Sequence, residues 1–198
     1  MTSEMTPEDL SSYGIGDGIS EVIATTQSSS GKPNAAPVGI INRGELLIRL
    51  YKSRTLSNVL ETMKIAANIC ADAMIFAITA LGDIDDEKFT HFRGFPVLKD
   101  ADAWILFRCH MRERAANFFV FNLEPIAMHA NRKRVMAVNR GFNAVIEAAI
   151  LATRAKNTEK SVKMMEHYKR IVDKCGGRRE KDAMNFVISA FRRICDEG

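Results

Sequence analysis

The apolar residues of this chain change their spacing near residue 138. Before that point they form short runs rich in β-branched and aromatic residues, separated by glycine, proline and asparagine, which is typical of strands and turns. After it they recur every three or four residues, as along one side of a helix. This change predicts a mainly β domain at residues 1–138, followed by a C-terminal helical subdomain at residues 139–198.

The β region is expected to begin with a hairpin. Its first strand covers residues 19–27, the segment SSSGKPN supplies the turn, and residues 35–42 form the returning strand. The later elements follow from the same composition rules. They are a strand at 45–52, a short helix at 55–63 capped by Thr55 or Asn58, strands at 64–70 and 72–81, a long surface excursion at 83–100, and strand-like residues at 101–126.

Three amphipathic helices are expected in the C-terminal part. The apolar positions of residues 139–156, 161–175 and 179–195 each align on one side at helical spacing. Gly176 and Gly177 lie where the second helix should stop, because glycine is favoured just beyond a helix C-terminus. No internal repeat is detectable.

Composition excludes several classes of protein. Hydrophobic residues make up 46% and charged residues 26% of the 198 residues, the balance of a globular chain. The most apolar stretch, residues 73–81, is far shorter than the roughly 20 residues that span a bilayer. The acidic, turn-rich N-terminus is unlike a secretory signal, so we expect a cytoplasmic protein. The four cysteines lack zinc-ligand spacing, which predicts reduced thiols and no metal.

A polar cluster follows the strand that ends near residue 51. Hydroxyl, amide and cationic side chains lie together where this strand should lead into a helix N-terminus, a place where unpaired N–H groups and the helix dipole favour an anion such as phosphate. The alternative is that the hydroxyl and amide side chains merely cap the helix while the cations lie in solvent. The cluster consists of Lys52, Ser53, Arg54, Thr55, Ser57 and Asn58.

The segments around this cluster resemble a known superfamily. VIATTQSSSGKPNAAPVGI resembles the first hairpin of FMN-binding split barrels, the superfamily of flavin reductases and pyridoxamine-phosphate oxidases, and ELLIRLYKSRTLSN followed by KIAANIC resembles its phosphate-binding half. The order of GISEVIATT, NAAPVGI, YKSRTLSN, AANI and NRGFNAVIEAAILATR is similar to the family named domain of unknown function 447. That similarity extends over nearly the whole chain.

The resemblance implies a fold and a cofactor. The fold is a Greek-key-like antiparallel split β-barrel with a three-helix extension, and the cofactor is FMN, bound near the interface of a homodimer. Asn34 to Gly39 would face the isoalloxazine ring, and the residues of the cluster other than Ser57 would hold the phosphate. One departure is Cys70-Ala71-Asp72-Ala73, where an acidic residue and proline are expected. The implied cofactor-binding residues are Asn34, Ala35, Ala36, Pro37, Val38, Gly39, Lys52, Ser53, Arg54, Thr55, Asn58 and Asn68.

Several other side chains have two interpretations. Asn68 could bond the flavin or, as a buried amide, the backbone. His110 and Arg112 could approach a substrate or mark a solvated strand end. The basic run at residues 131–134 with Arg140 is read as a solvated loop, because the recognised nucleic-acid-binding patterns are missing. Asn139, Arg140 and Glu147 could reach the ligand, or could be a helix cap and exposed helix residues.

The residues leave two main functions open. The first is an FMN-dependent oxidoreductase of unknown substrate, in which the cofactor carries the chemistry and the catalytic residues remain unknown. The second is a module that binds FMN or another phosphorylated ligand without turnover. A nicotinamide or other electron donor would be a partner of the enzyme, but the chain lacks the G-x-G-x-x-G motif that could bind it. Membrane and nucleic-acid partners are not expected, although a basic tail that recruits nucleic acid is a weaker third possibility.

Overall fold

The computed structural model describes residues 7–132, 136–154 and 158–197, and the chain divides into two compact units. The first unit contains the described residues up to Ala71 and those from Ile84 to residue 132. The second contains Asp72–Asp83 together with the described residues from 136 onward. The helical unit is therefore built from two separate stretches of sequence.

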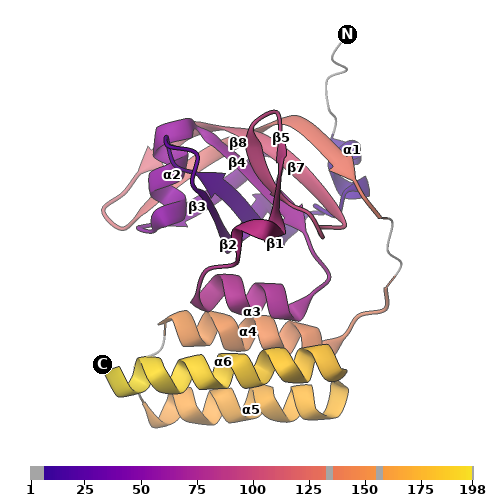
Figure 1. Ribbon diagram of the computed structural model, residues 1–198, viewed down its shortest axis with the longest axis vertical. Helices are drawn as coiled ribbons and strands as arrows, with labels where there is room; N and C mark the ends of the chain where they lie inside the picture. Colours follow the sequence, from indigo (N-terminus) through magenta and orange to yellow (C-terminus); the bar gives the residue numbers. More distant parts are fainter. Residues whose placement is uncertain (1–6, 133–135, 155–157, 198) are drawn as a thin grey trace. The chain divides into compact units, whose positions relative to one another are not determined.

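The first unit is a closed antiparallel barrel. Its strands follow one another around the barrel in the order β1-β2-β3-β8-β7-β4, and most are visible in Figure 1. This confirms the predicted fold class, since each strand overlaps a segment that the sequence had marked as strand-like. The strands are β1 (Gly18–Gln27), β2 (Pro33–Asn42), β3 (Leu46–Tyr51), β4 (Lys64–Ile69), β7 (Ala103–Arg114) and β8 (Phe118–Ala130).

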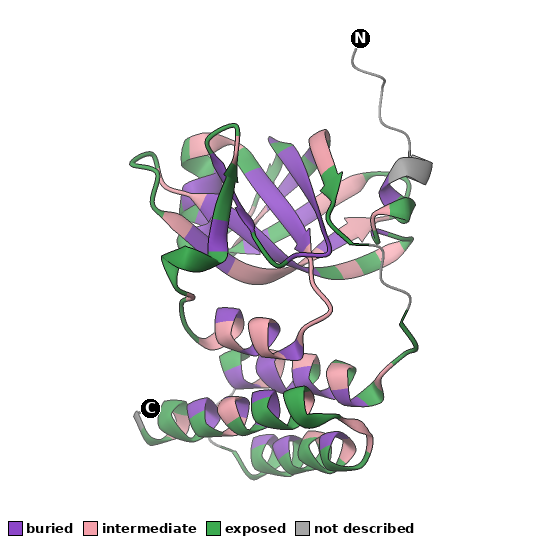
Figure 2. Cartoon of the chain, turned by 45° about the vertical axis from the view of Figure 1, so that its right-hand side comes forward, coloured by how far each residue is buried: buried purple, intermediate pink, exposed green. Residues whose placement is uncertain are grey.

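Alternating side chains fill the barrel interior. Val22, Ile48, Phe107 and Phe121 belong to one buried core, and their neighbours in sequence point to the outer face. Figure 2 marks the buried residues of the strands in purple. Helix α2 (Arg54–Thr62) contributes Leu56 and Val59 to the same core, so it is fixed to the barrel by burial of its apolar side.

The strand pairing around the closed barrel is incomplete between two neighbouring strands. β2 and β3 pair only where Ile40–Asn42 meets Leu46–Ile48, and within these described strands the pairing stops there. β1, in contrast, pairs with β2 along its whole length, from Gly18↔Asn42 to Gln27↔Pro33. The β3-side backbone edge of β2 from Pro33 to Gly39 therefore lies outside the strand pairing, and this gap in the pairing is called the opening below.

The prediction of a strand at residues 72–81 is wrong. Ala73–Leu81 form a helix, α3, whose N-cap is Asp72: its carboxylate accepts a hydrogen bond from the Met74 N–H at 2.9 Å. Ala73 and Ala77 are buried in the core of the helical unit. A short apolar run without periodicity fits either a buried strand or a buried helix, which explains the error.

The prediction of a plain surface excursion at residues 83–100 is also wrong. A 3₁₀ turn at Asp86–Lys88 leads into a hairpin of β5 (Phe89–Phe92) and β6 (Phe95–Leu98). Arg93 and Gly94 form its tip with positive φ angles of 48° and 77°. Phe95 and Val97 pack on Trp104. The hairpin therefore covers part of the outer face of the barrel.

The second unit is helical, as the sequence predicted. α4 (Arg140–Arg154), α5 (Glu159–Cys175) and α6 (Arg178–Glu197) share a core with α3 that includes Val145, Val172 and Val187. Gly176 ends α5 as expected. A Cβ on Gly141 of α4 would lie only 2.6 Å from the Cα of Gly176, so the backbone approaches closely here. A helix at Pro7–Ser12, α1, was not predicted. None of the helices in the described residues is long and apolar enough to cross a membrane.

Candidate anion site at the start of helix α2

The candidate site begins where β3 ends and α2 starts. Two residues separate them, and the second, Ser53, is the N-cap: it has an extended backbone and its Oγ accepts a hydrogen bond from the Leu56 N–H at 3.3 Å. The predicted caps Thr55 and Asn58 are therefore incorrect. They lie inside the helix and are buried, because this side of α2 faces the barrel.

A buried polar network joins α2 to the first hairpin. Asn34 Nδ2 donates to Thr55 Oγ1 at 3.1 Å and to Thr26 Oγ1 at 3.5 Å. Asn58 Nδ2 donates to the same Thr26 hydroxyl at 3.0 Å. All four residues are at most 7% exposed, so their mutual bonds satisfy polar groups that water does not reach. The structure thus brings together three residues that the sequence had proposed, around a fourth that it had missed.

Two cations lie at the exposed edge of this network. Arg54 Nη1 donates to Asn34 Oδ1 at 3.4 Å, and Lys52 is exposed just before the helix. The first turn of α2 contains no acidic residue. A helix N-terminus presents N–H groups that the helix itself cannot bond, and its dipole favours negative charge. The arrangement is therefore suited to an anion.

Thr26 is the residue that sequence reasoning overlooked. It lies in TTQ, before the hairpin turn, where the strand pattern gave it no special role. The pairing register of the predicted hairpin could have indicated it, because Thr26 lies opposite Asn34 across β1 and β2 and both side chains lie on the same face. Placing that pair next to α2 requires the tertiary structure.

The run from Asn34 to Gly39 does not present one face. Val38 packs against the interior core, so Asn34, Ala36 and Val38 share that side while the residues between them point outward. A Cβ on Gly39 would lie 2.7 Å from Ile19 Cγ2, which gives this glycine a packing reason on β1. The run can meet a ligand as a whole only through its backbone edge. Its role in binding stays a prediction.

Asn68 holds the β5–β6 hairpin to the barrel. Its Nδ2 donates to Ile23 O at 2.9 Å and to Thr25 Oγ1 at 3.0 Å, and its Oδ1 accepts from the Leu98 N–H at 2.8 Å. The residue is fully buried. These bonds favour the structural alternative for Asn68 over contact with a ligand.

The contacts of His110 and Arg112, near the end of β7, also favour a structural role over contact with a substrate. His110 Nε2 lies 2.7 Å from Glu124 Oε2, and Arg112 forms an ion pair with Glu45, all on an exposed face. The hydrogen bond from His110 and the charge of Arg108 lower the pKa of the Glu124 carboxyl. These residues form a solvated charge network.

The remaining candidate residues lie in helix α4 or in the segment that precedes it. Asn139 Oδ1 accepts from the Gly141 N–H at 2.8 Å, as a helix cap does, and Arg140 and Glu147 are exposed. In the basic run at 131–134, Asn131 Nδ2 donates to Ala101 O at 3.0 Å, whereas residues 133 and 134 lie outside the described residues. The helix-cap interpretation of Asn139 is therefore confirmed.

The cysteines do not form a reactive or metal-binding centre in the described part of the chain. None of the four is in a disulfide, and burial raises the pKa of the Cys109 thiol to about 12. No group of three or more metal-ligating side chains occurs among the described residues. A buried thiol with a raised pKa is a poor nucleophile.

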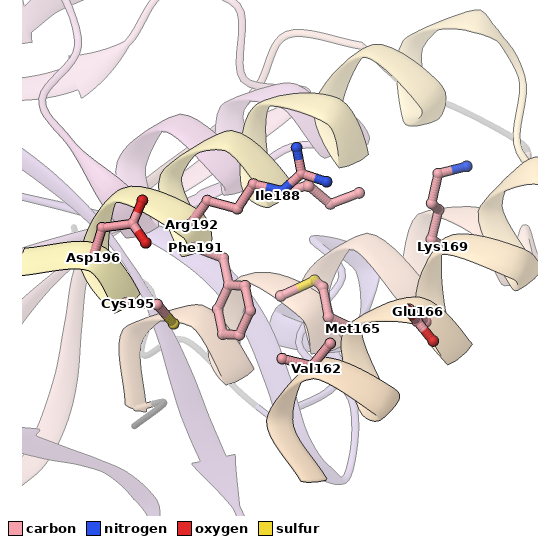
Figure 3. Close-up of a pocket in the computed structure, with 9 residues that line it drawn as sticks. All are labelled: Val162, Met165, Glu166, Lys169, Ile188, Phe191, Arg192, Cys195 and Asp196. Atoms are coloured by element: carbon pink, nitrogen blue, oxygen red, sulfur yellow. The ribbon is translucent and has the colours of Figure 1, made fainter. Parts of the chain in front are cut away.

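A separate hollow lies in the helical unit between α5 and α6. Figure 3 shows its lining residues, among them Phe191 and Met165, with charged side chains of both signs. Its volume is about 260 Å³, and one of the charges, Lys169, is already paired with Asp173 at 2.6 Å. α5 and α6 each share the apolar core with α4, so the hollow is the groove left between two neighbouring helices.

The fold defines the class of protein: an antiparallel split barrel with a polar, cationic helix start at its opening and a helical extension. The chain belongs to the family of proteins of unknown function DUF447, since residues 20–132 match its N-terminal domain and residues 139–189 its C-terminal part. An FMN-bound protein of this family from Methanosarcina mazei has a similar crystal structure. The two are 40% identical over 92% of this chain and 100% of the other, with a TM-score of 0.87.

More distant solved structures also match part of the chain. The flavin reductase of styrene monooxygenase from Pseudomonas putida S12 is 16% identical over 59% of this chain and 82% of its own, with a TM-score of 0.48. Flavoredoxin from Methanosarcina acetivorans is 16% identical over 60% and 72%, with a TM-score of 0.47. Likeness at this level does not extend to the residues of the site.

Proposed function

We propose that this protein binds FMN and is a flavoprotein. The observation that carries the proposal is the Arg54–Asn34–Thr55 contact, which places a guanidinium and a helix N-terminus beside the open edge of β2. The FMN bound to the Methanosarcina mazei relative, 40% identical over nearly the whole chain, supports the same assignment.

The phosphate of FMN would lie at the start of α2. Arg54 and Lys52 supply positive charge there, and the first N–H groups of the helix supply hydrogen-bond donors. Thr55 and Asn58 support this surface from below, since their side chains already bond within the buried network. Ser53 keeps the helix start in place as its cap.

The flavin ring would lie along the edge of β2. Residues from Asn34 to Gly39 have their β3-side backbone groups outside the strand pairing, so N–H and C=O groups can meet the polar edge of the ring. Ala36 is small enough to let the ring approach the backbone. This arrangement requires the backbone rather than the side chains of the run to recognise the ring.

We also propose that the protein is an oxidoreductase. Bound FMN supplies the hydride or electron transfer, while the chain binds the cofactor, orients it and excludes water. The substrate and the electron donor, a nicotinamide or another reductant, are not specified by any described side chain. The alternative is a module that holds FMN without turnover, and only a reaction can separate the two.

A homodimer with the flavin near its interface is part of the same proposal. Two large apolar side chains of this region are exposed: Tyr51, which precedes α2, at 55%, and Leu60, near the C-terminal end of α2, at 42%. An interface that covered both would bury apolar surface that a monomer leaves in water. Light scattering of the purified protein tests this directly, and a monomeric mass at all concentrations would remove the dimer.

The function is tested by the visible absorbance spectrum of the purified protein, followed by heat release and chromatographic identification of the ligand. A flavin spectrum with FMN released is the expected result. A colourless protein that does not bind added FMN would overturn the proposal. Anaerobic addition of NADH or NADPH to the holoprotein then tests turnover. Bleaching of the flavin absorbance faster than that of free FMN under the same conditions supports the enzyme, and bleaching no faster than that of free FMN favours the binding module.

A further inference from the structure

Thr26 lies at the centre of the network beneath the candidate phosphate site. It is completely buried at the end of β1, and its hydroxyl accepts N–H groups from both Asn34 and Asn58. Asn34 belongs to β2 and Asn58 to α2, so this one oxygen connects two strands and a helix. Asn34 Nδ2, which donates to Thr26 and to Thr55, joins the same three elements from β2.

The direction of the Asn34 amide follows from its partners. A primary amide has two N–H donors on one side and a carbonyl acceptor on the other. Because Thr26 and Thr55 accept the donors, Oδ1 must point the other way, where Arg54 Nη1 donates to it. The hydroxyl of Thr26 therefore acts, through Asn34, on the position of a guanidinium that it does not touch.

We propose that Thr26 is a positioning residue that gives the site its preference for phosphorylated over unphosphorylated flavin. The proposal rests on the FMN-binding function above. In this arrangement Thr26 contacts no ligand. It holds Asn34 with its oxygen toward Arg54, and it anchors Asn58 so that α2 keeps its N-terminus directed at the opening.

A purely structural role predicts a different result. If Thr26 only satisfied two buried amides, its loss would lower stability and weaken FMN and riboflavin binding to the same extent. A positioning role lowers the affinity for FMN more, because only FMN has the phosphate that Arg54 and the helix start would meet. The ratio of the two dissociation constants separates these roles, whereas the melting temperature does not.

The chain offers a matched control in the adjacent residue. Thr25 is equally buried, and its hydroxyl also accepts from an asparagine amide, that of Asn68, at 3.0 Å. It points to the opposite face of β1, where it donates to Pro96 O at 2.7 Å. Thr25→Val therefore removes the same chemical group at the same depth, without touching the network under α2.

The experiment measures FMN and riboflavin binding to the apoprotein by flavin fluorescence for the wild type, Thr26→Val, Thr26→Ser and Thr25→Val. For Thr26→Val we expect the FMN-to-riboflavin preference to fall about tenfold, which corresponds to about 1.4 kcal/mol. Thr26→Ser, which keeps the hydroxyl, should retain the preference, and Thr25→Val should retain it despite lower stability.

Four outcomes would count against these assignments in different ways. An unchanged preference in Thr26→Val, or an equal loss in Thr25→Val, would overturn the role of Thr26 while leaving FMN binding intact. A wild-type protein that binds neither flavin would overturn the proposed function as well. If Thr26→Val does not fold, Thr26→Cys replaces it, since a thiol keeps the volume but is a weak acceptor; an unchanged preference there also overturns the proposal.

Discussion

The N-cap of α3 allows a prediction that separates two contributions to the stability of the helical unit. Asp72 accepts a hydrogen bond from the Met74 N–H at 2.9 Å, and it also pairs with Arg179 of α6, whose Nε lies 2.8 Å from its Oδ1. Asparagine caps a helix as well as aspartate does but has no charge. Asp72→Asn therefore removes the ion pair alone, whereas Asp72→Ala removes the pair and the cap.

The expected magnitudes differ by about a factor of three. Loss of an N-cap costs about 1 kcal/mol. The ion pair is worth less, about 0.5 kcal/mol, because the Asp72 and Arg179 side chains are 34% and 63% exposed and water screens them. We expect the free energy of unfolding to fall by about 0.5 kcal/mol in Asp72→Asn and by about 1.5 kcal/mol in Asp72→Ala. Urea unfolding followed by circular dichroism at 222 nm measures both.

The effect should depend on pH. Partial burial raises the pKa of Asp72, but hydrogen bonds from Arg179 and the Met74 N–H outweigh it, so the pKa lies below its usual 3.8. The stabilisation by the carboxylate is therefore present at neutral pH and is lost as the pH falls through this lowered pKa. Equal losses in Asp72→Asn and Asp72→Ala, or a difference between Asp72→Asn and wild type that does not shrink as the pH falls, would refute the reasoning.

Three further predictions concern the barrel. Arg54→Ala should weaken FMN binding about tenfold and leave riboflavin binding unchanged; tenfold is the low end for a charged hydrogen bond, because Arg54 is exposed. Lys64→Ala, which removes another exposed cation, is the control. Equal effects of Arg54→Ala on both flavins would contradict the assignment. Asn68→Ala should lower the free energy of unfolding by about 2 kcal/mol, since the Leu98 N–H and Thr25 lose a buried partner. Limited proteolysis should then cut the β5–β6 hairpin faster than in wild type. A hairpin as resistant as in wild type would argue against this role of Asn68. Cys109 should not react with a maleimide at pH 8 until urea is added, and labelling of the folded protein at this position, detected by peptide mass, would refute its burial.

Patterns that depend on neighbours in the sequence were predictable. β1, β2 and β3 follow from alternating composition and turn residues, and α4 to α6 follow from helical spacing. The cluster after β3 was also visible, because hydroxyls and cations at a strand-to-helix junction suit either a helix cap or an anion site. These features are local, and each was decided by chemistry within a few residues.

Features set by distant contacts were not predictable. Residues 73–81 are apolar all round, so only their contact with α4 and α6 makes them a helix rather than a strand. Thr26 became part of the site through its register with Asn34 and its bond to Asn58, 32 residues away. Ser53 became the cap because β3 ends early, a boundary of the kind that sequence patterns define poorly.

The split origin of the helical unit has a consequence for the order of events on the ribosome. All six barrel strands have been synthesised once Ala130 has been added, but α3, made earlier, then still lacks the helices that cover Ala73 and Ala77. Its apolar surface must stay exposed until α4 to α6 emerge, the condition under which nascent chains aggregate or recruit chaperones. A nascent chain stalled shortly after Ala130 would therefore have its barrel strands complete and α3 uncovered.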